Sequence, residues 1–258
     1  MTTLPKSCTA RRRSLRCLAL PLAALGLVGG ADVVRAEPGY YVVTPYDNQG
    51  LLRVDFRYWA AKPAGRTEVQ WPELGLGWGI NSRWTTELYV SWIGSAQAAT
   101  RPDTLNWQND VLLTQGEWPV DLALHTQWVQ DQDSPRQQTL EWGPALQTDI
   151  GRWRLNGNVF FEQGLDPDRS SPTQLQYQWR TRYRLGPVLG VGLDGFGELG
   201  TWNHWAPKAQ QNHRAGPALA GQWPLENRRS LLVQGAWLWG KTYGRQGHLF
   251  SLKATLDY

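Results

Sequence analysis

Apolar and polar residues alternate one by one along much of the chain beyond residue 50. The clearest example runs from Trp84 to Trp92, where Trp, Thr, Leu, Val and Trp take every second position and Thr, Glu, Tyr and Ser lie between them. Successive side chains of a β-strand point to opposite faces, whereas a helix brings residues three and four apart onto one face. The pattern therefore predicts strands with one apolar face and one polar face.

About twelve segments of this kind are predicted, each near the ten residues that a strand needs to span a membrane. They centre on residues 51–61, 69–80, 84–93, 104–114, 120–130, 138–149, 153–162, 173–185, 188–199, 213–223, 229–239 and 247–258. The shorter connections are 81–83, 115–119, 150–152, 186–187 and 224–228, and the longer ones include 94–103, 131–136, 163–172 and 200–212. Because short and long connections alternate, the pattern predicts a closed antiparallel barrel with short turns at one end. Ten or fourteen strands would also fit the pattern.

Two Gly-Pro pairs, Gly143-Pro144 and Gly216-Pro217, fall inside predicted strands. Proline has no N–H group and removes a hydrogen bond from a strand ladder, so it is usually confined to strand ends, edges and bulges. We expect both pairs to mark bulges or strand ends.

The start of the chain has the pattern of an export signal. Four arginines between Arg11 and Arg16 precede an apolar run from Cys17 to Val28, and Val34-Arg35-Ala36 offers small residues for cleavage. These features predict a secretory signal peptide over residues 1–36. A barrel must cross the inner membrane unfolded, which favours the general secretory route.

Removing residues 1–36 changes the charge and the cysteine content. Of the 26 Lys and Arg residues 20 remain, and of the 22 Asp and Glu residues 21 remain, so the formal net charge of +4 falls to near −1. No nucleic-acid partner is predicted from that balance. Cys8 and Cys17 also lie in the removed segment. The rest of the chain therefore offers no disulfide and no cysteine-based metal or catalytic site.

The last predicted strand ends on an aromatic residue, and its apolar positions are Phe250, Leu252, Ala254, Leu256 and Tyr258. This ending resembles the C-terminal strand of bacterial outer-membrane β-barrel proteins, in which a terminal aromatic residue and apolar residues at every second position form the signal for assembly. The resemblance implies a location in the bacterial outer membrane. It also implies two kinds of partner, the lipids of that membrane and the barrel-assembly machinery.

The predicted fold is accordingly all-β: a closed antiparallel transmembrane β-barrel over residues 51–258, with short periplasmic turns and longer external loops. The 16 tryptophans agree with it, because aromatic rings gather where a barrel meets the two membrane interfaces. Residues 37–50 are expected to form either a periplasmic tail or a plug inside the barrel. A secreted β-sandwich is the alternative fold.

The polar faces of the strands would line the lumen with charges of both signs. The candidate pore-lining residues are Arg180, Arg182, Arg184, Glu87, Asp121, His125, Glu141, Glu162, Asp194, Glu198 and Arg214. Gly75, Gly77 and Gly79 also fall on the inward face, where we expect them to leave room in the lumen.

Three of the inward arginines, Arg180, Arg182 and Arg184, follow one another on a single strand. They could guide a polar or anionic solute, or they could pair with acids on neighbouring strands and close the barrel. If the turn at 186–187 is tight, Arg180 lies opposite Asp194, whereas Arg182 and Arg184 lie opposite glycines. One arginine would then be paired, and two would have open space across from them.

No enzymatic constellation is predicted. The histidines are His125, His204, His213 and His248, and His125 points inward near acids. No inward serine falls on a neighbouring strand to complete a Ser-His arrangement. We predict no catalytic residue, no metal site and no cofactor.

The predicted function is that of a passive channel or transport component for small polar or charged solutes, whose identity is open. In size and strand number the chain resembles small channels for acidic oligosaccharides, whose lumens carry arginine tracks. Here acids are more numerous than such tracks imply. The alternatives are a lipid-modifying enzyme of the outer membrane and a structural or adhesive barrel. A monomer or a weakly associated barrel is expected.

Overall fold

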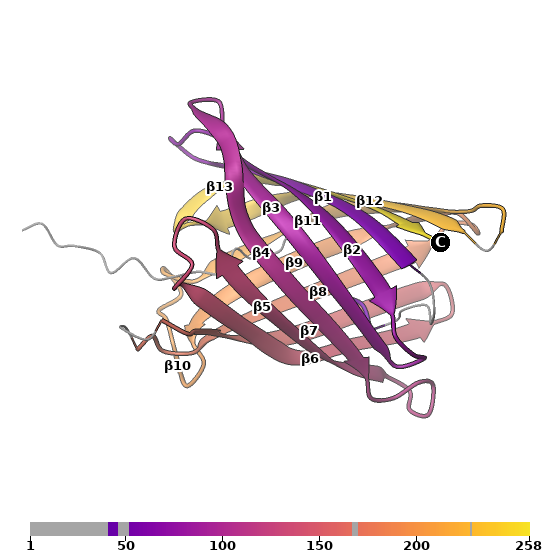
Figure 1. Ribbon diagram of the computed structural model, residues 1–258. Helices are drawn as coiled ribbons and strands as arrows, with labels where there is room; N and C mark the ends of the chain where they lie inside the picture. Colours follow the sequence, from indigo (N-terminus) through magenta and orange to yellow (C-terminus); the bar gives the residue numbers. More distant parts are fainter. Residues whose placement is uncertain (1–40, 46–51, 167–169, 228) are drawn as a thin grey trace, which may run out of the picture. The chain divides into compact units, whose positions relative to one another are not determined.

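A computed structural model describes residues 41–45, 52–166, 170–227 and 229–258 (Figure 1). Its strands are β1 (Leu52–Pro63), β2 (Val69–Gly79), β3 (Trp84–Ser95), β4 (Ala98–Leu112), β5 (Asp121–Asp131), β6 (Gln138–Ile150), β7 (Trp153–Gly164), β8 (Gln174–Arg184), β9 (Leu189–Thr201), β10 (His204–Trp205), β11 (Asn212–Pro224), β12 (Ser230–Thr242) and β13 (Arg245–Asp257). In these residues no helix is long and apolar enough to cross a membrane. The predicted signal peptide, 1–36, lies outside the described residues.

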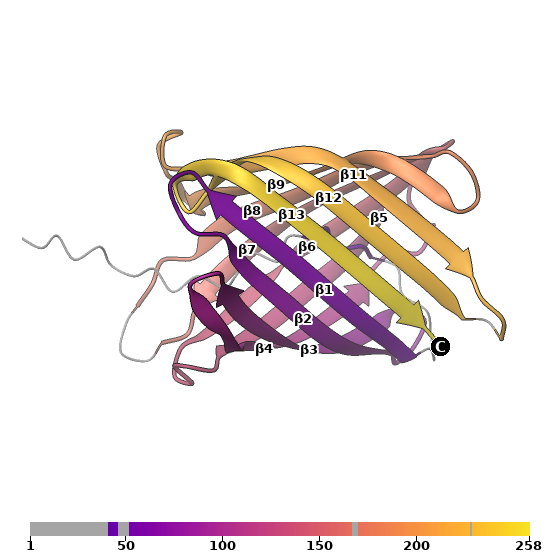
Figure 2. The same ribbon diagram turned by 90° about the horizontal axis from the view of Figure 1, so that it is seen from above.

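Twelve long strands of the described chain form one closed antiparallel sheet. Each pairs with the next along the chain, except that the two-residue β10 folds back on β9 and leaves β9 beside β11. β1 pairs with β13, from Arg53 opposite Asp257 to Pro63 opposite Gly247 (Figure 2). The prediction of a closed barrel of about twelve strands is confirmed. We call the end that holds Tyr258 the turn end and the opposite end the loop end.

The predicted long connection 94–103 is wrong. β3 and β4 continue to Ser95 and Ala98, so that only two residues join them. Their pairing shifts register between Val90 and Trp92, and again between Ile93 and Ser95. Each bulge adds a residue to one strand and reverses the faces of the residues beyond it. A strict period of two therefore stops in the sequence before the strands stop in the structure.

The two Gly-Pro pairs lie within continuous strands rather than at bulges or strand ends, which corrects the expectation. On the side of the preceding strand Pro144 pairs with Leu124, and Pro217 pairs with Leu193. On the other side the pairing is missing only at the Gly-Pro positions and resumes at Ala145 and Ala218 in the same register. Proline thus removes hydrogen bonds on one side only, and the neighbouring strand keeps its alignment.

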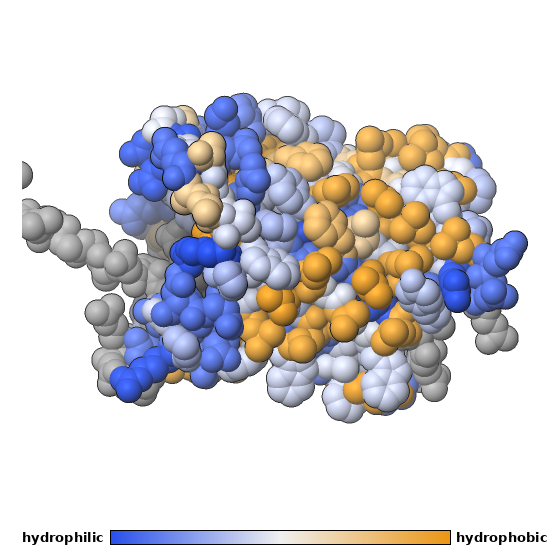
Figure 3. Space-filling view, turned by 45° about the horizontal axis from the view of Figure 1, so that its top comes forward, coloured by the Kyte–Doolittle hydropathy of each residue, from blue (hydrophilic) through white to orange (hydrophobic). Residues whose placement is uncertain are grey.

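Apolar side chains cover the outside of the barrel. Exposed examples are Leu76, Trp78, Leu88, Trp107 and Leu219. Figure 3 shows apolar residues in orange gathered over the strands, with hydrophilic residues crowding one end. The two-sided alternation of the sequence therefore separates an apolar exterior from a largely polar interior.

The interior also contains an apolar core, which the alternation did not indicate. Trp59, Trp71, Phe196, Leu238 and Leu249 point inward and are at most 4% exposed. A wide aqueous pore would leave such side chains in water. Their burial shows that other groups fill the middle of the barrel.

Candidate functional site

Residues Tyr41–Pro45, which we call the lumen segment, lie inside the barrel. Val42 and Val43 are each only 5% exposed. Val42 packs in the cluster with Trp59 and Leu238, whereas Val43 packs with Phe160 and Ala145 on the other side. Burying one valine side chain contributes about 1.5–3 kcal/mol. The segment is therefore held in the lumen by apolar packing in two directions.

Two inward amides bind the backbone of the lumen segment. Asn158 Nδ2 donates a hydrogen bond to the carbonyl oxygen of Val43 at 2.9 Å, and the Val43 N–H donates to Gln178 Oε1 at 3.0 Å. Asn158 Nδ2 also donates to Gln178 Oε1 at 3.1 Å. A buried backbone group without such a partner would be costly. The side chains of Asn158 and Gln178 thus supply the hydrogen bonds that neighbouring strands would supply in a sheet.

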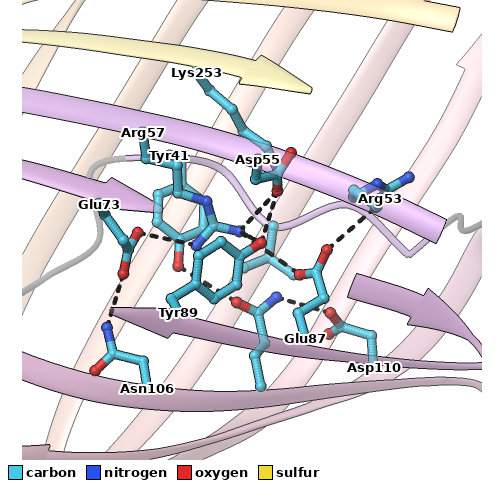
Figure 4. Close-up of polar contacts among 12 residues, drawn as sticks. Tyr41, Arg53, Asp55, Arg57, Glu73, Glu87, Tyr89, Asn106, Asp110 and Lys253 are labelled. Atoms are coloured by element: carbon cyan, nitrogen blue, oxygen red, sulfur yellow. Dashed lines mark hydrogen bonds and ion pairs between the residues drawn. The ribbon is translucent and has the colours of Figure 1, made fainter. Parts of the chain in front are cut away.

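Arg57 lies at the centre of the interior between two tyrosine rings. Its Cζ atom is 3.7 Å from the ring centroid of Tyr41 and 3.6 Å from that of Tyr89 (Figure 4). A guanidinium between two aromatic faces is stabilised by both, and most strongly when water is excluded. Tyr41 therefore ties the lumen segment to the barrel wall.

Carboxylates surround the edge of the same guanidinium. Arg57 Nη1 is 3.4 Å from Glu73 Oε2, and Arg57 Nη2 is 3.6 Å from both Asp55 Oδ2 and Glu87 Oε2. We call Arg57, Asp55, Glu73 and Glu87 the Arg57 cluster. Lys253 Nζ lies 3.1 Å from Asp55 Oδ2 and adds a second cation at the edge of the cluster. These buried charges are stable only because they neutralise one another.

The inward histidine, His125, is held between acids rather than beside a nucleophile. Its Nδ1 is 2.6 Å from Asp110 Oδ1, its Nε2 is 3.5 Å from Glu141 Oε1, and its ring packs against Phe160 at 4.8 Å between centroids. In the described ranges no group of three or more His, Cys, Asp or Glu residues could hold a metal ion. The arrangement joins His125 to two acids inside the wall.

A cavity of about 280 Å³ opens between the lumen segment and the turn end of the barrel. Val42 and Thr44 of the lumen segment border it. Among the described residues its charged lining is Arg53, Arg154, Arg180, Arg182, Arg184, Lys253 and Asp257. Six cations and one acid thus line this cavity, and its preference for anions depends on which of the six are not already paired with acids of the wall.

The register of the arginine strand is as predicted, with Arg180 opposite Asp194 and Arg182 opposite Gly192. Arg180 Nε and Nη2 each donate to a different oxygen of Asp194 at 2.8 Å. Arg184 does not face open space as expected, because its Nη2 lies 3.8 Å from Asp149 Oδ2 and donates to the carbonyl oxygen of Gly151 at 3.0 Å. Arg180 and Arg184 are therefore paired with groups of the barrel wall.

Arg182 differs from its two neighbours on the strand. It is 9% exposed and lines the turn-end cavity, and its Nε and Nη2 atoms make no hydrogen bond with any residue in the described part of the chain. The other five lining cations each contact an acid. A buried N–H donor without a partner is costly unless a ligand or water satisfies it. Arg182 is thus the residue best placed to bind an anion in this cavity.

A second cavity, of about 410 Å³, lies toward the loop end. Glu162, Gln176, Glu198, His204 and Asn212 are among its lining residues. Its acids are held in place by neighbours: Arg214 Nη2 and Asn212 Nδ2 are each 2.6 Å from Glu198, and Gln176 donates to Glu162. This cavity is therefore rich in amides and acids, unlike the basic cavity at the turn end.

The remaining predicted pore-lining residues also face inward. Glu87 joins the Arg57 cluster, and Glu141 lies next to His125. Asp121 lies at the turn end, where it accepts a hydrogen bond from the N–H of Gly116 at 2.6 Å. Sequence reasoning missed Tyr41, because residues 41–45 carry no strand period, and Lys253, although its position on the polar face of the last strand was a usable signal.

The predicted assembly residues lie in β13 and just beyond it. The outward Phe250 contacts the rings of Trp237 and Tyr58, at 6.1 and 6.4 Å between centroids. The N–H of Tyr258 donates to the carbonyl oxygen of Leu52 at 2.8 Å, so the terminal residue continues the pairing of β13 with β1. The other apolar members are Leu252, Ala254 and Leu256, which alternate with the inward Lys253, Thr255 and Asp257.

No family model matches the chain, and no curated protein matches it. Solved structures do match its fold. The COG4313 outer membrane channel from Pseudomonas putida F1 has 12% sequence identity over 87% of this chain and 100% of that chain, with a TM-score of 0.56. The NanC porin has 9% identity over 80% and 98% of the two chains, with a TM-score of 0.54. The KdgM porin has 8% identity over 80% and 99%, with a TM-score of 0.53. The chain thus shares the barrel fold of these channels, as the sequence predicted.

Proposed function

We propose that this chain is a passive channel of the bacterial outer membrane for small polar or charged solutes, with a preference for anions. The observation that carries the proposal is the turn-end cavity, in which a buried arginine side chain has unsatisfied donors. Proteins described as an outer membrane channel and as porins share the fold and support the same function. The apolar exterior of the barrel supports a position in a lipid bilayer.

Arg182 is the proposed selectivity residue. Its neighbours Arg180 and Arg184 are occupied by Asp194 and Asp149, so their charges are largely compensated within the wall. An anion that enters the cavity would find free N–H donors only at a few positions, and charge-assisted hydrogen bonds to a carboxylate or phosphate are among the strongest in proteins. Of the three arginines in the predicted track, only Arg182 is therefore proposed to contact the solute.

The test is the conductance of the refolded protein in a planar bilayer, with the reversal potential measured under a salt gradient. We expect a current with anion preference, and we expect Arg182→Gln to shift the reversal potential toward cations while the folded fraction is retained. Arg152→Gln is the matched control, because Arg152 is exposed in the turn outside the lumen. A folded barrel that passes no ions, both as wild type and without residues 41–45, would contradict the function. An unchanged reversal potential in Arg182→Gln would contradict the role of that residue.

Recognition by the barrel-assembly machinery is proposed for the terminal residue. Tyr258→Ala is expected to lower the amount of heat-modifiable barrel in the outer membrane by several-fold. Its refolding in detergent should be nearly normal, because the backbone hydrogen bond to Leu52 does not need the ring. Leu189→Ala, at another exposed apolar position of the turn end, is the control. An unchanged membrane yield of Tyr258→Ala would show that the aromatic side chain is not the signal.

A further inference from the structure

We propose that the outer surface of β12, β13 and β1, at the loop end, binds a lipid whose headgroup carries two phosphate groups, as the glycolipid of the outer leaflet does. The proposal rests on the position in the outer membrane given above, with the loop end outside. It concerns the lipid-facing side of the barrel and not the lumen. The surface consists of Lys62, Arg66, Arg245 and His248, which we call the cationic patch, and of the aromatic rings next to them.

The residues of the cationic patch lie together on two neighbouring hairpins. Lys62 on β1 is paired with His248 on β13, and these strands lie side by side in Figure 2. Side chains paired in this way have Cβ atoms about 4.5–5.5 Å apart. Arg245 begins β13, and its Nη1 donates a hydrogen bond to the carbonyl oxygen of Ala64 at 3.4 Å, in the turn that also contains Arg66. All four side chains are exposed, so one ligand can contact several of them at once.

The protein does not compensate the charge of the patch. The acid closest in the sequence to Lys62 and Arg66 is Glu68, which accepts a hydrogen bond from Gln70 Nε2 at 3.3 Å. The lysine and the two arginines of the patch against this one acid leave a formal charge of +2. Two phosphate groups would supply the missing negative charge. Hydrogen bonds from guanidinium and ammonium groups to phosphate are also among the strongest in proteins.

Exposed arginines elsewhere on the barrel already have acidic partners. Arg83 Nη2 lies 2.8 Å from Glu117 Oε1 at the turn end, and Arg101 contacts Asp133 on the β4 side of the loop end. Within the described ranges, the three cations of the patch form no such ion pair. The uncompensated charge is therefore a local feature of β12, β13 and β1 rather than a general property of the loop end.

Outward aromatic rings adjoin the patch on the side of the membrane. Trp239 is paired with His248, and the pair of Trp237 and Phe250 lies two residues further from the loop end. The ring of Trp237 is 6.1 Å from each of the rings of His248 and Phe250, between centroids. Aromatic rings of membrane proteins gather at the level of the lipid headgroups, and strand residues two apart are separated by about 7 Å. The cationic patch therefore lies at the headgroup level or just beyond it.

Cations and aromatic rings together favour a lipid over other anions. Free phosphate would contact the patch but leave the half-exposed rings of Trp237 and Trp239 without a partner. An anionic protein outside the membrane would reach the cations but not the rings, which face the lipid. A lipid contacts both sets, because its phosphates lie at the cations and its acyl chains pass along the rings. Basic residues next to a membrane attract anionic lipids in the same way.

Lipid binding can be measured on the refolded protein in detergent. Protein from residue 37 onward is titrated with diphosphoryl lipid A in the presence of a chelator, and the bound fraction is determined by native mass spectrometry. The patch variant carries Lys62→Gln, Arg66→Gln and Arg245→Gln. We expect it to bind at least about tenfold more weakly than the wild type, because three attractions to phosphate are lost. All three positions are exposed, so the heat-modifiable folded fraction should be retained.

A matched control removes the same number of exposed cations elsewhere. It carries Arg83→Gln, Arg101→Gln and Arg152→Gln, and its affinity for diphosphoryl lipid A should stay within about twofold of the wild type. A conservative variant with Arg66→Lys and Arg245→Lys keeps the charge of the patch and should also bind normally.

Two further probes test the two parts of the ligand. Phosphatidylglycerol has one phosphate and should bind at least about tenfold more weakly than diphosphoryl lipid A. Inorganic pyrophosphate has the charge but no acyl chain, and it should not displace the lipid at equal concentration. Trp239→Ala should weaken the binding of diphosphoryl lipid A several-fold, because an aromatic contact with the lipid is lost.

The outcomes separate this proposal from the channel function. Equal affinity of the patch variant and the matched control for diphosphoryl lipid A would overturn the proposal. Displacement of the lipid by pyrophosphate would show a site for free phosphate, and equally tight binding of phosphatidylglycerol would show that one phosphate is enough; either result overturns the proposed ligand. A barrel that binds the lipid through the patch but passes no current would overturn the channel and support the patch, whereas a conducting barrel whose patch variant binds normally would do the reverse.

Discussion

Replacing Arg57 with methionine is expected to lower the free energy of unfolding by about 3–5 kcal/mol, the usual cost of breaking a buried ion pair. The side chain of Arg57 is 2% exposed, and those of Asp55, Glu73 and Glu87 are at most 5% exposed. Methionine fills similar volume, but it cannot neutralise these acids or donate to them. Asp55 would keep its contact with Lys253 and Glu87 its contact with Arg53, but Glu73 would lose its contact with Arg57.

The measurement is urea unfolding of the refolded barrel, followed by tryptophan fluorescence. Arg83→Met is the matched control, because Arg83 also contacts an acid, Glu117, but both side chains are about half exposed. An exposed pair of this kind contributes about 0–1 kcal/mol. Equal losses in the two variants would show that the Arg57 cluster is not the main electrostatic support of the barrel interior.

Valine at position 75 is expected to destabilise the barrel by about 3 kcal/mol, through overpacking and the loss of an aromatic contact. A Cβ atom at Gly75 would lie 2.1 Å from Cε1 of Tyr89. The Tyr89 ring would have to leave its place over Arg57, and the guanidinium would lose one of its two aromatic neighbours. Gly75 therefore makes room in the lumen, as predicted, and the Tyr89 ring fills that room.

Gly157→Val is the control for this prediction. Gly157 lies on the outward face of β7, opposite Trp179, and a Cβ atom there would meet nothing within 4 Å. Valine favours the strand conformation, so this variant should keep the stability of the wild type. Near-UV circular dichroism should change in Gly75→Val and not in Gly157→Val. A Gly75→Val barrel with normal stability would mean that Tyr89 is not needed where it lies.

Most strands of the barrel wall could be predicted from the sequence, because the side chains of a spanning strand face the lipid and the lumen in turn and therefore alternate between apolar and polar. The side chains from Trp84 to Trp92 alternate between the outside and the inside of the barrel as predicted. The pairing of Arg180 with Asp194 was also predicted correctly, because a tight turn joins their strands. The prediction weakened where local rules no longer apply. Bulges ended the period near 94–103, and the Gly-Pro pairs were taken for interruptions of strands that in fact continue.

Which charged side chains pair with one another was harder to predict than whether each of them faces the lumen. Arg184 could be placed on the inward face, but its contact with Asp149 depends on the register of β6, β7 and β8 together. Arg57 likewise gathers acids from β1, β2 and β3. Each such contact needs two or more strand registers at once, and an error of one residue in any register turns the side chain to the other face.

The sequence by itself determined the all-β class, the closed barrel of about twelve strands and the inward direction of its charges, because these follow from a local period of two. Only the tertiary structure decided what fills the middle of the barrel. Residues 41–45 carry no periodic signal, and their place depends on surfaces that several strands build together, from Trp59 on β1 to Gln178 on β8. The tertiary structure also decided that Arg182 is the arginine of its strand with unsatisfied donors, because this depends on every acid that the closed sheet brings within reach.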